Sequence, residues 1–158
     1  MASTIRAATI DDIATMVELS ERKREQYERF QPVFWRKAAD SRERHTTYLA
    51  GLLARGQHLA LVAEAAGALD GFLIAELRPA PPVCDPGGLT CLVDDFVVAD
   101  EARWDDVGSM LLRRVGEEAR ARGAVQLVVV CAHLDGPKRA MLASAAFSVA
   151  SEWHVRPL

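Results

Sequence analysis

The sequence has few of the features that membrane proteins and nucleic-acid-binding proteins need. No window approaches the roughly 20 apolar residues of a membrane span. The N-terminal segment MASTIRAATIDDI has no apolar core flanked by basic residues, as a secretory signal would. The formal charge is -3, and the charged residues are scattered rather than gathered into a basic face that would bind phosphates. We therefore expect a cytoplasmic protein with neither a membrane nor a nucleic acid as its partner.

Cysteine and histidine are also scarce. The three cysteines include no Cys-x-x-Cys pair, and their odd number argues against a disulfide framework. The four histidines stand far apart, without the spacing that places two metal ligands on one helix face. We therefore expect no disulfide and no metal site. With 158 residues, half of them hydrophobic, the chain has the size of a single domain that spans residues 1–158.

Helical patterns mark the first third of the chain. Thr9, followed by Asp12 three residues later, resembles a capping box that opens a helix. Pro32 predicts the end of this helix, because proline cannot donate the next backbone hydrogen bond. A second helix is expected from Asp40 or Ser41 to Gly56, since apolar residues recur there at helical spacing.

Strand patterns are frequent in the remainder. Segments 58–64 and 71–77 predict a hairpin, because two β-prone runs flank a glycine-containing turn. After a proline-rich loop we expect a strand at 90–98 and a helix from Val107 to Gly123. The apolar run 124–132 is typical of a strand that is covered on both faces. A short helix at 138–146 and a closing strand at 148–158 complete the expected order.

The segment VADEARWDDVG, residues 98–108, resembles motif A of the GNAT acyltransferase superfamily. In that motif a strand leads through Arg/Gln-x-x-Gly-x-Gly/Ala into a helix. The expected order of elements is also the order of that family, so the resemblance extends over nearly the whole chain. It implies an α/β (α+β) fold in which a mixed, mostly antiparallel central sheet is flanked by about four helices and contains a splayed strand pair.

The resemblance also implies acetyl-CoA as a cosubstrate. Its pantetheine arm would lie between the splayed strands and pair with backbone groups, as an added strand would. Its pyrophosphate would meet backbone N–H groups at a helix N-terminus, where the macrodipole favours an anion. The residues matched to these roles are Phe96, Val97, Val98, Arg103, Trp104, Val107, Gly108 and Ser109.

Two aspartates depart from the motif, because Asp106 stands at the first glycine and Asp105 at a usually basic position. A carboxylate about 5 Å from a phosphate costs on the order of 3 kcal/mol at an effective dielectric of about 20, or roughly a hundredfold in affinity. Aspartate is also a favoured N-cap, so capping is the structural alternative. Lys138 and Arg139 either compensate the lost positive charge or belong to a solvated helix end.

Acyl transfer to an amine needs a base for the amine and an acid for the leaving thiolate. Asp94 and Asp95 lie on the strand that passes the acyl group in the family. Alternation predicts that they face opposite ways, so that one of them is the base, and we favour Asp94. The family's usual acid is a tyrosine, but the matching position here is Leu142. His133 is the nearest titratable residue that could replace it.

The first two helices and the proline-rich loop are expected to build the amine pocket, with aromatic residues such as Tyr27, Phe34 and Trp35. The prediction is an acetyl-CoA-dependent N-acetyltransferase that acts on a small amine or a protein amino group. One alternative is a catalytically silent module of the same fold that binds acyl-CoA or a protein partner. Another is a thiol hydrolase that uses Cys131 and His133. The apolar terminal segment also suggests pairing into a homodimer.

Overall fold

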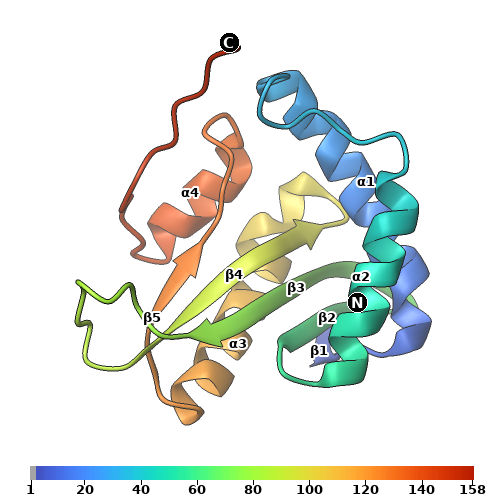
Figure 1. The fold of residues 1–158 in the computed structure, drawn as a ribbon. Coiled ribbons are helices and arrows are strands. Elements are labelled where there is room, and N and C mark those ends of the chain that lie inside the picture. The colour runs from blue at the N-terminus through green and yellow to red at the C-terminus, as the bar shows by residue number, and fades with distance from the viewer. Residues whose placement is uncertain (1–2) are drawn as a thin grey trace.

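The computed structural model, which describes residues 3–158, has a five-stranded sheet with the strand order β1-β2-β3-β4-β5 at its centre (Figure 1). The strands are β1 (Thr4–Ala7), β2 (Leu59–Ala65), β3 (Ala68–Arg78), β4 (Leu89–Val98) and β5 (Ala124–Val129). The first four strands are antiparallel neighbours, and β5 lies parallel to β4. The predicted mixed, mostly antiparallel sheet is confirmed.

Helices cover both faces of this sheet (Figure 1). In the described part of the chain they are α1 (Ile13–Phe30), α2 (Ser41–Arg55), α3 (Ser109–Ala121) and α4 (Gly136–Ser144). Leu61 and Leu73 pack in one core with α3 and α4, whereas Val62 and Phe72 pack in a second core with α1 and α2. Alternation along β2 and β3 therefore supplies a separate apolar layer for each pair of helices.

The signals at the helix ends are confirmed. Thr9 and Asp12 form a capping box, in which the Thr9 N–H donates to Asp12 Oδ2 at 2.7 Å. A 3₁₀ turn follows this box and leads directly into α1, which ends at Phe30, two residues before Pro32. Gly56 ends α2 in the left-handed conformation, with φ of 63°. Local sequence chemistry is therefore sufficient to set these boundaries.

Two strand predictions are wrong. Residues 148–158 form no strand, and this segment passes outside α4 (Figure 1), with Trp153 packed edge-to-face on Phe34 at 5.8 Å between ring centroids. Alternation is a local pattern, whereas a strand also needs a neighbouring edge in register, and this segment turns away from β5. β5 is therefore the last strand of the sheet. It is also not covered on both faces, because Val125 is 53% exposed. Among the described residues, no helix is long and apolar enough to cross a membrane.

Candidate active site

The strands β4 and β5 separate part of the way along β4. Their last paired residues are Val93 and Val129, followed by a hydrogen bond from Val130 N to Val93 O at 3.1 Å. Beyond this point β4 continues to Val98 with β3 as its paired strand, while the chain after β5 leads away toward α4 (Figure 1). This is the splayed strand pair that the sequence predicted, and the opening between its strands is called the wedge below.

A β-bulge lies in β4 where the wedge begins. Leu73 and Ala75 of β3, two residues apart, pair with Phe96 and Val93 of β4, which are three residues apart. The extra residue interrupts strict alternation, so that Asp94 and Asp95 both line the same pocket. The prediction that these two carboxylates face opposite ways is therefore wrong.

The pocket between α1, α2 and β4 has a volume of about 460 Å³. Its apolar walls include Tyr27, Phe34 and Trp35, as expected, together with Tyr48 of α2. The proline-rich loop, which was also expected to contribute, supplies none of the residues that line it. A small polar molecule would therefore meet aromatic rings on one side and the two carboxylates of β4 on the other.

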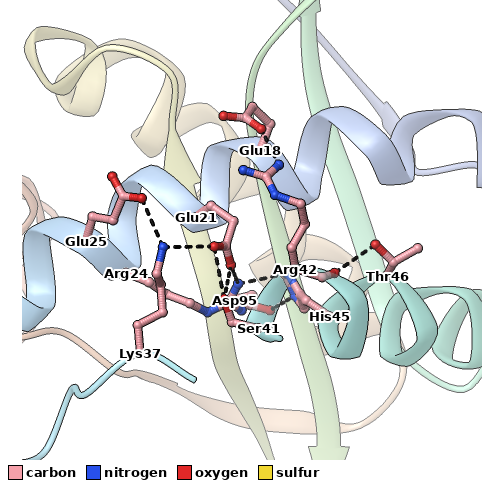
Figure 2. Close-up of polar contacts among 10 residues, drawn as sticks. All are labelled: Glu18, Glu21, Arg24, Glu25, Lys37, Ser41, Arg42, His45, Thr46 and Asp95. Atoms are coloured by element: carbon pink, nitrogen blue, oxygen red, sulfur yellow. Dashed lines mark hydrogen bonds and ion pairs between the residues drawn. The ribbon is translucent and has the colours of Figure 1, made fainter. Parts of the chain in front are cut away.

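His45 holds Asp95 in place from the facing helix α2 (Figure 2). Its ring is buried, and its Nε2 lies 2.9 Å from Asp95 Oδ2. On the other side of the ring, Arg24 Nη1 approaches Nδ1 at 3.2 Å. A guanidinium can donate but not accept, so Nδ1 is the acceptor and the proton of the neutral ring lies on Nε2, which donates to Asp95. Arg24 is held in turn by Glu21 at 3.1 Å.

The two carboxylates of the pocket differ in acidity. Burial raises the pKa of Asp94, and the negative charges of Asp95 and Glu76 raise it further. For Asp95, burial acts in the same direction, but the hydrogen bond from His45 and the positive charges of Arg24 and Lys138 outweigh it and lower the pKa. Asp94 is thus the more basic of the pair, which is the property that a proton acceptor requires.

Lys138 of α4 reaches into the wedge from the opposite side. Its Nζ donates to the carbonyl of Val130 at 2.9 Å and to that of Phe96 at 3.3 Å, so it bridges the two strands where they part. The residue is 2% exposed and also lines the pocket. Its Nζ lies 5.4 Å from the ring centroid of Trp104. Burial lowers the pKa of Lys138 to about 8.

The helix N-terminus that was expected to bind pyrophosphate is closed by its own side chains. Asp106 Oδ1 accepts a hydrogen bond from Val107 N at 2.6 Å, and its Oδ2 lies 2.8 Å from Arg103 Nη2. The guanidinium of Arg103 also pairs with Asp70 at 2.8 Å and donates to the Ser3 hydroxyl at 3.1 Å. Asp106 therefore takes up the N–H of Val107 and pairs with Arg103, two groups that the resemblance assigned to the pyrophosphate.

Trp104 explains the shape of this turn. Its ring is 2% exposed and packs edge-to-face on Phe96 at 4.9 Å between centroids. The chain from Trp104 to Gly108 forms a π-helical turn, in which the N–H of Ser109 bonds to backbone carbonyls of the turn itself. A Cβ on Gly108 would come within 2.6 Å of the Trp104 ring. The glycine therefore makes room for an indole ring.

The remaining sequence candidates lie away from the pocket. His133 is exposed and does not line it, and its backbone carbonyl accepts a hydrogen bond from Arg139 at 2.6 Å. Cys131 donates to the carbonyl of Ala132, and burial raises the pKa of its thiol. A nucleophilic cysteine needs a lowered pKa, so the geometry gives no support to a thiol hydrolase. Leu142, which stands at the position of the family's tyrosine, is buried in the core.

Sequence reasoning missed His45 and the inward direction of Lys138. Both sit at helical spacing from buried apolar residues: His45 precedes Leu49 by four positions, and Lys138 precedes Leu142 by four. A polar residue on the buried stripe of a helix is a signal that could have found them. Their partners, which lie about 40 to 50 residues away on β4, leave no local mark in the sequence.

Several solved structures of other proteins are similar to this chain in fold. No protein-family model matches the sequence, and no curated protein matches it. A predicted acetyltransferase from Clostridium acetobutylicum, solved with acetyl-CoA, has a TM-score of 0.74 and 18% identity, with 98% of this chain and 96% of that chain covered. Glucosamine-6-phosphate N-acetyltransferase from Arabidopsis thaliana has a TM-score of 0.69 and 14% identity, with 99% of both chains covered. A transcriptional regulator from Bacillus halodurans has a TM-score of 0.72 and 20% identity, with the same coverage.

The fold is that of GNAT-type acetyltransferases, and the fold class predicted from motif A is confirmed. A shared fold at this level of identity gives the architecture, whereas the chemistry and the substrate have to be argued from the site. Within the wedge, the backbone carbonyls of Phe96 and Val130 accept hydrogen bonds from the Lys138 side chain rather than from a neighbouring strand.

Proposed function

We propose that the protein is a cytoplasmic, acetyl-CoA-dependent N-acetyltransferase that acts on an amine, either a small molecule or a protein amino group. The observation that carries this proposal is the pocket in which Asp94 and Asp95 lie together where β4 leaves β5. A carboxylate beside an opening for a thioester is the arrangement that amine acylation needs, since the amine has to lose a proton as it attacks. The fold shared with acetyltransferases supports the same chemistry.

The residues divide into two roles. Asp94 takes the proton of the amine at its carboxylate oxygen, while Asp95, held by His45, supplies a fixed negative charge that favours a cationic acceptor. The backbone of Phe96, Val97 and Val98 would hold the pantetheine arm, and residues 103–109 would hold the pyrophosphate once Asp106 moves aside. Acetyl-CoA supplies the acyl group as an activated thioester when it is bound.

A second candidate is a module of the same fold that binds acyl-CoA or a protein partner without turnover. The closed turn at Asp106 favours it, because the carboxylate occupies a backbone N–H that a phosphate would otherwise use. The open outer edge of β5 could serve such a partner, or a second copy of this chain in a homodimer, because Val125 and Val128 are exposed there.

Calorimetry and a thiol-release assay separate these candidates. Titration of the protein with acetyl-CoA is expected to give a binding heat, and incubation with a broad panel of amines is expected to release free thiol with at least one of them. Binding without release across the panel would replace the enzyme by the silent module. No binding heat at high micromolar acetyl-CoA would remove acetyl-CoA from the proposal altogether.

A further inference from the structure

Lys138 lies at the apex of the wedge, whereas His133, the acid that the sequence suggested, does not line the pocket. Its Nζ bridges the carbonyls of Val130 and Phe96 directly after the last hydrogen bond between the two strands. A thioester held between β4 and the chain that follows β5 has to pass this point. Lys138 also lies on the buried face of α4, four residues before Leu142. Leu142 is the residue that stands in place of the family's tyrosine.

The surroundings of Lys138 suit proton donation. Burial is the main cause that lowers its pKa to about 8, and the positive charge of Lys23 adds to this effect. Cys131, Asp135 and Asp95 act in the opposite direction. The result is close to the pKa of about 8.5 for an alkyl thiol. An ammonium whose pKa is close to that of the thiol can give its proton to a thiolate at neutral pH. An ordinary lysine, with a pKa of about 10.4, holds its proton too firmly.

We propose that Lys138 is the catalytic acid that protonates the leaving thiolate, an assignment that rests on the proposed acetyltransferase function. The amine nitrogen forms a bond to the thioester carbonyl carbon, and the carbon–sulfur bond breaks with its electron pair on sulfur. The amine gives its proton to Asp94, and Lys138 Nζ gives a proton to the sulfur. Solvent then takes the proton from Asp94 and restores the one on Lys138, so that charge and protons balance over one turnover.

The leaving group provides a test that a structural role cannot imitate. Lys138→Met is expected to lower kcat with acetyl-CoA about 100-fold, with a much smaller change in KM. With an acetyl donor whose leaving group is an acidic aromatic thiol, which needs no proton to depart, the same variant is expected to come within a few-fold of wild type. Equal losses with both donors, or no loss with acetyl-CoA, would overturn the assignment. Arg113→Met, at an exposed position of α3, controls for the removal of a positive charge.

A second variant guards against misfolding. Lys138→Arg keeps a buried cation that can reach both carbonyls, and circular dichroism would verify that it folds. A guanidinium does not release its proton at neutral pH, so this variant is expected to remain slow with acetyl-CoA and to recover with the aromatic donor. Full activity with acetyl-CoA would contradict the proposed role.

The protein without any ligand offers an independent measurement. The chain has three lysines, so ¹⁵N-lysine labelling gives three side-chain signals, and that of Lys138 is assigned by its loss in Lys138→Met. We expect this signal to titrate near pH 8, and kcat of wild type to fall as pH rises through the same range. If Lys138 stays protonated beyond pH 10, its assignment as the catalytic acid is wrong, even if acetyl transfer itself is observed. If wild type neither binds acetyl-CoA nor releases thiol, the proposed function fails and the assignment falls with it.

Discussion

His45 Nε2 and Asp95 Oδ2 lie 2.9 Å apart, although the two residues are separated by 50 positions in the sequence. The contact joins α2 to β4 across the pocket, and Arg24 fixes the opposite side of the imidazole ring (Figure 2). It also distinguishes two adjacent carboxylates, because Asp95 receives a hydrogen bond from His45 while Asp94 does not. The acid–base assignment of the pocket depends on this difference.

Replacing His45 by Phe should raise the pKa of Asp95. The variant removes the hydrogen bond that lowers this pKa, while the burial that raises it remains. A carboxyl ¹³C titration of aspartate-labelled protein would follow both residues, with signals assigned from Asp94→Asn and Asp95→Asn. An unchanged titration of Asp95 in His45→Phe would show that the histidine does not control its acidity.

Asp94→Asn should lower kcat about 100-fold and leave the affinity for acetyl-CoA nearly unchanged, because the amide keeps the shape of the side chain but cannot accept the amine proton. In wild type the base works when it is deprotonated, so kcat should fall as pH falls through the raised pKa of Asp94. Asp11→Asn, at an exposed position of the first turn, is the control. Turnover equal to wild type would remove Asp94 from the mechanism.

Asp106→Ala should strengthen acetyl-CoA binding about tenfold. The substitution releases the N–H of Val107 and frees Arg103 to meet a phosphate, and it removes a carboxylate that would repel one. The expected gain is below the roughly hundredfold effect of a carboxylate about 5 Å from a phosphate at an effective dielectric of about 20, because the Asp106 side chain is 57% exposed and solvent screens its charge. Asp105→Ala removes the same charge without opening these contacts and should gain less in calorimetry. Equal gains in affinity for the two variants would show that the effect comes from net charge alone.

Acid should weaken the fold through Asp12. Its hydrogen bonds from Arg6 outweigh burial and lower its pKa from 3.8 to about 2. Its stabilising contribution is therefore complete above about pH 4 and disappears as pH falls through 2. A shift of this size corresponds to about 2 kcal/mol. In urea unfolding, Asp12→Asn should lose about 2 kcal/mol at pH 7, and the difference from wild type should shrink below pH 4. A difference that persists unchanged at pH 2 would exclude this origin.

Gly108→Ala should destabilise the protein by about 1–3 kcal/mol, because the added methyl group would overlap the buried ring of Trp104. The backbone at Gly108 is helical, with φ of −60°, so the cost comes from packing rather than from conformation. Gly136→Ala meets no heavy atom within 4 Å and should change the free energy of unfolding by less than about 0.5 kcal/mol. Similar results for both variants would show that Trp104 is not held tightly.

The sequence predicts local features of this protein well. Thr9, Pro32 and Gly56 set helix ends through interactions within a few residues, and the apolar runs of β2 and β3 identify a hairpin. The site depends on contacts between distant segments. Alternation alone places Asp94 and Asp95 on opposite faces of β4. The bulge that brings them to the same pocket depends on the register between β4 and β3, which the residues of β4 do not reveal.

The same limit applies to the closed turn and to the wedge. Asp106 was recognised as an obstacle to phosphate binding, but its ion pair with Arg103 and its bond to Val107 follow from a π-helical turn that Trp104 stabilises by packing. Lys138 was expected either to compensate the lost positive charge near the phosphates or to belong to a solvated helix end. Its burial follows from the way that α4 packs against the diverging strands, which no spacing along the chain records.

Asp94 and Asp95 share one pocket because β4 has one residue more than β3 between their paired positions. The number of residues in this stretch of β4 therefore decides whether two adjacent side chains lie together. Deleting one residue at the bulge would return the strand to a regular pleat, in which consecutive side chains alternate between the two layers of helices. Because the bulge consists of Asp94 and Asp95, the deletion would also remove one of the two carboxyl groups, and the pocket would keep a solitary acid. A single-codon deletion at this point would thus cost this protein more than most substitutions there.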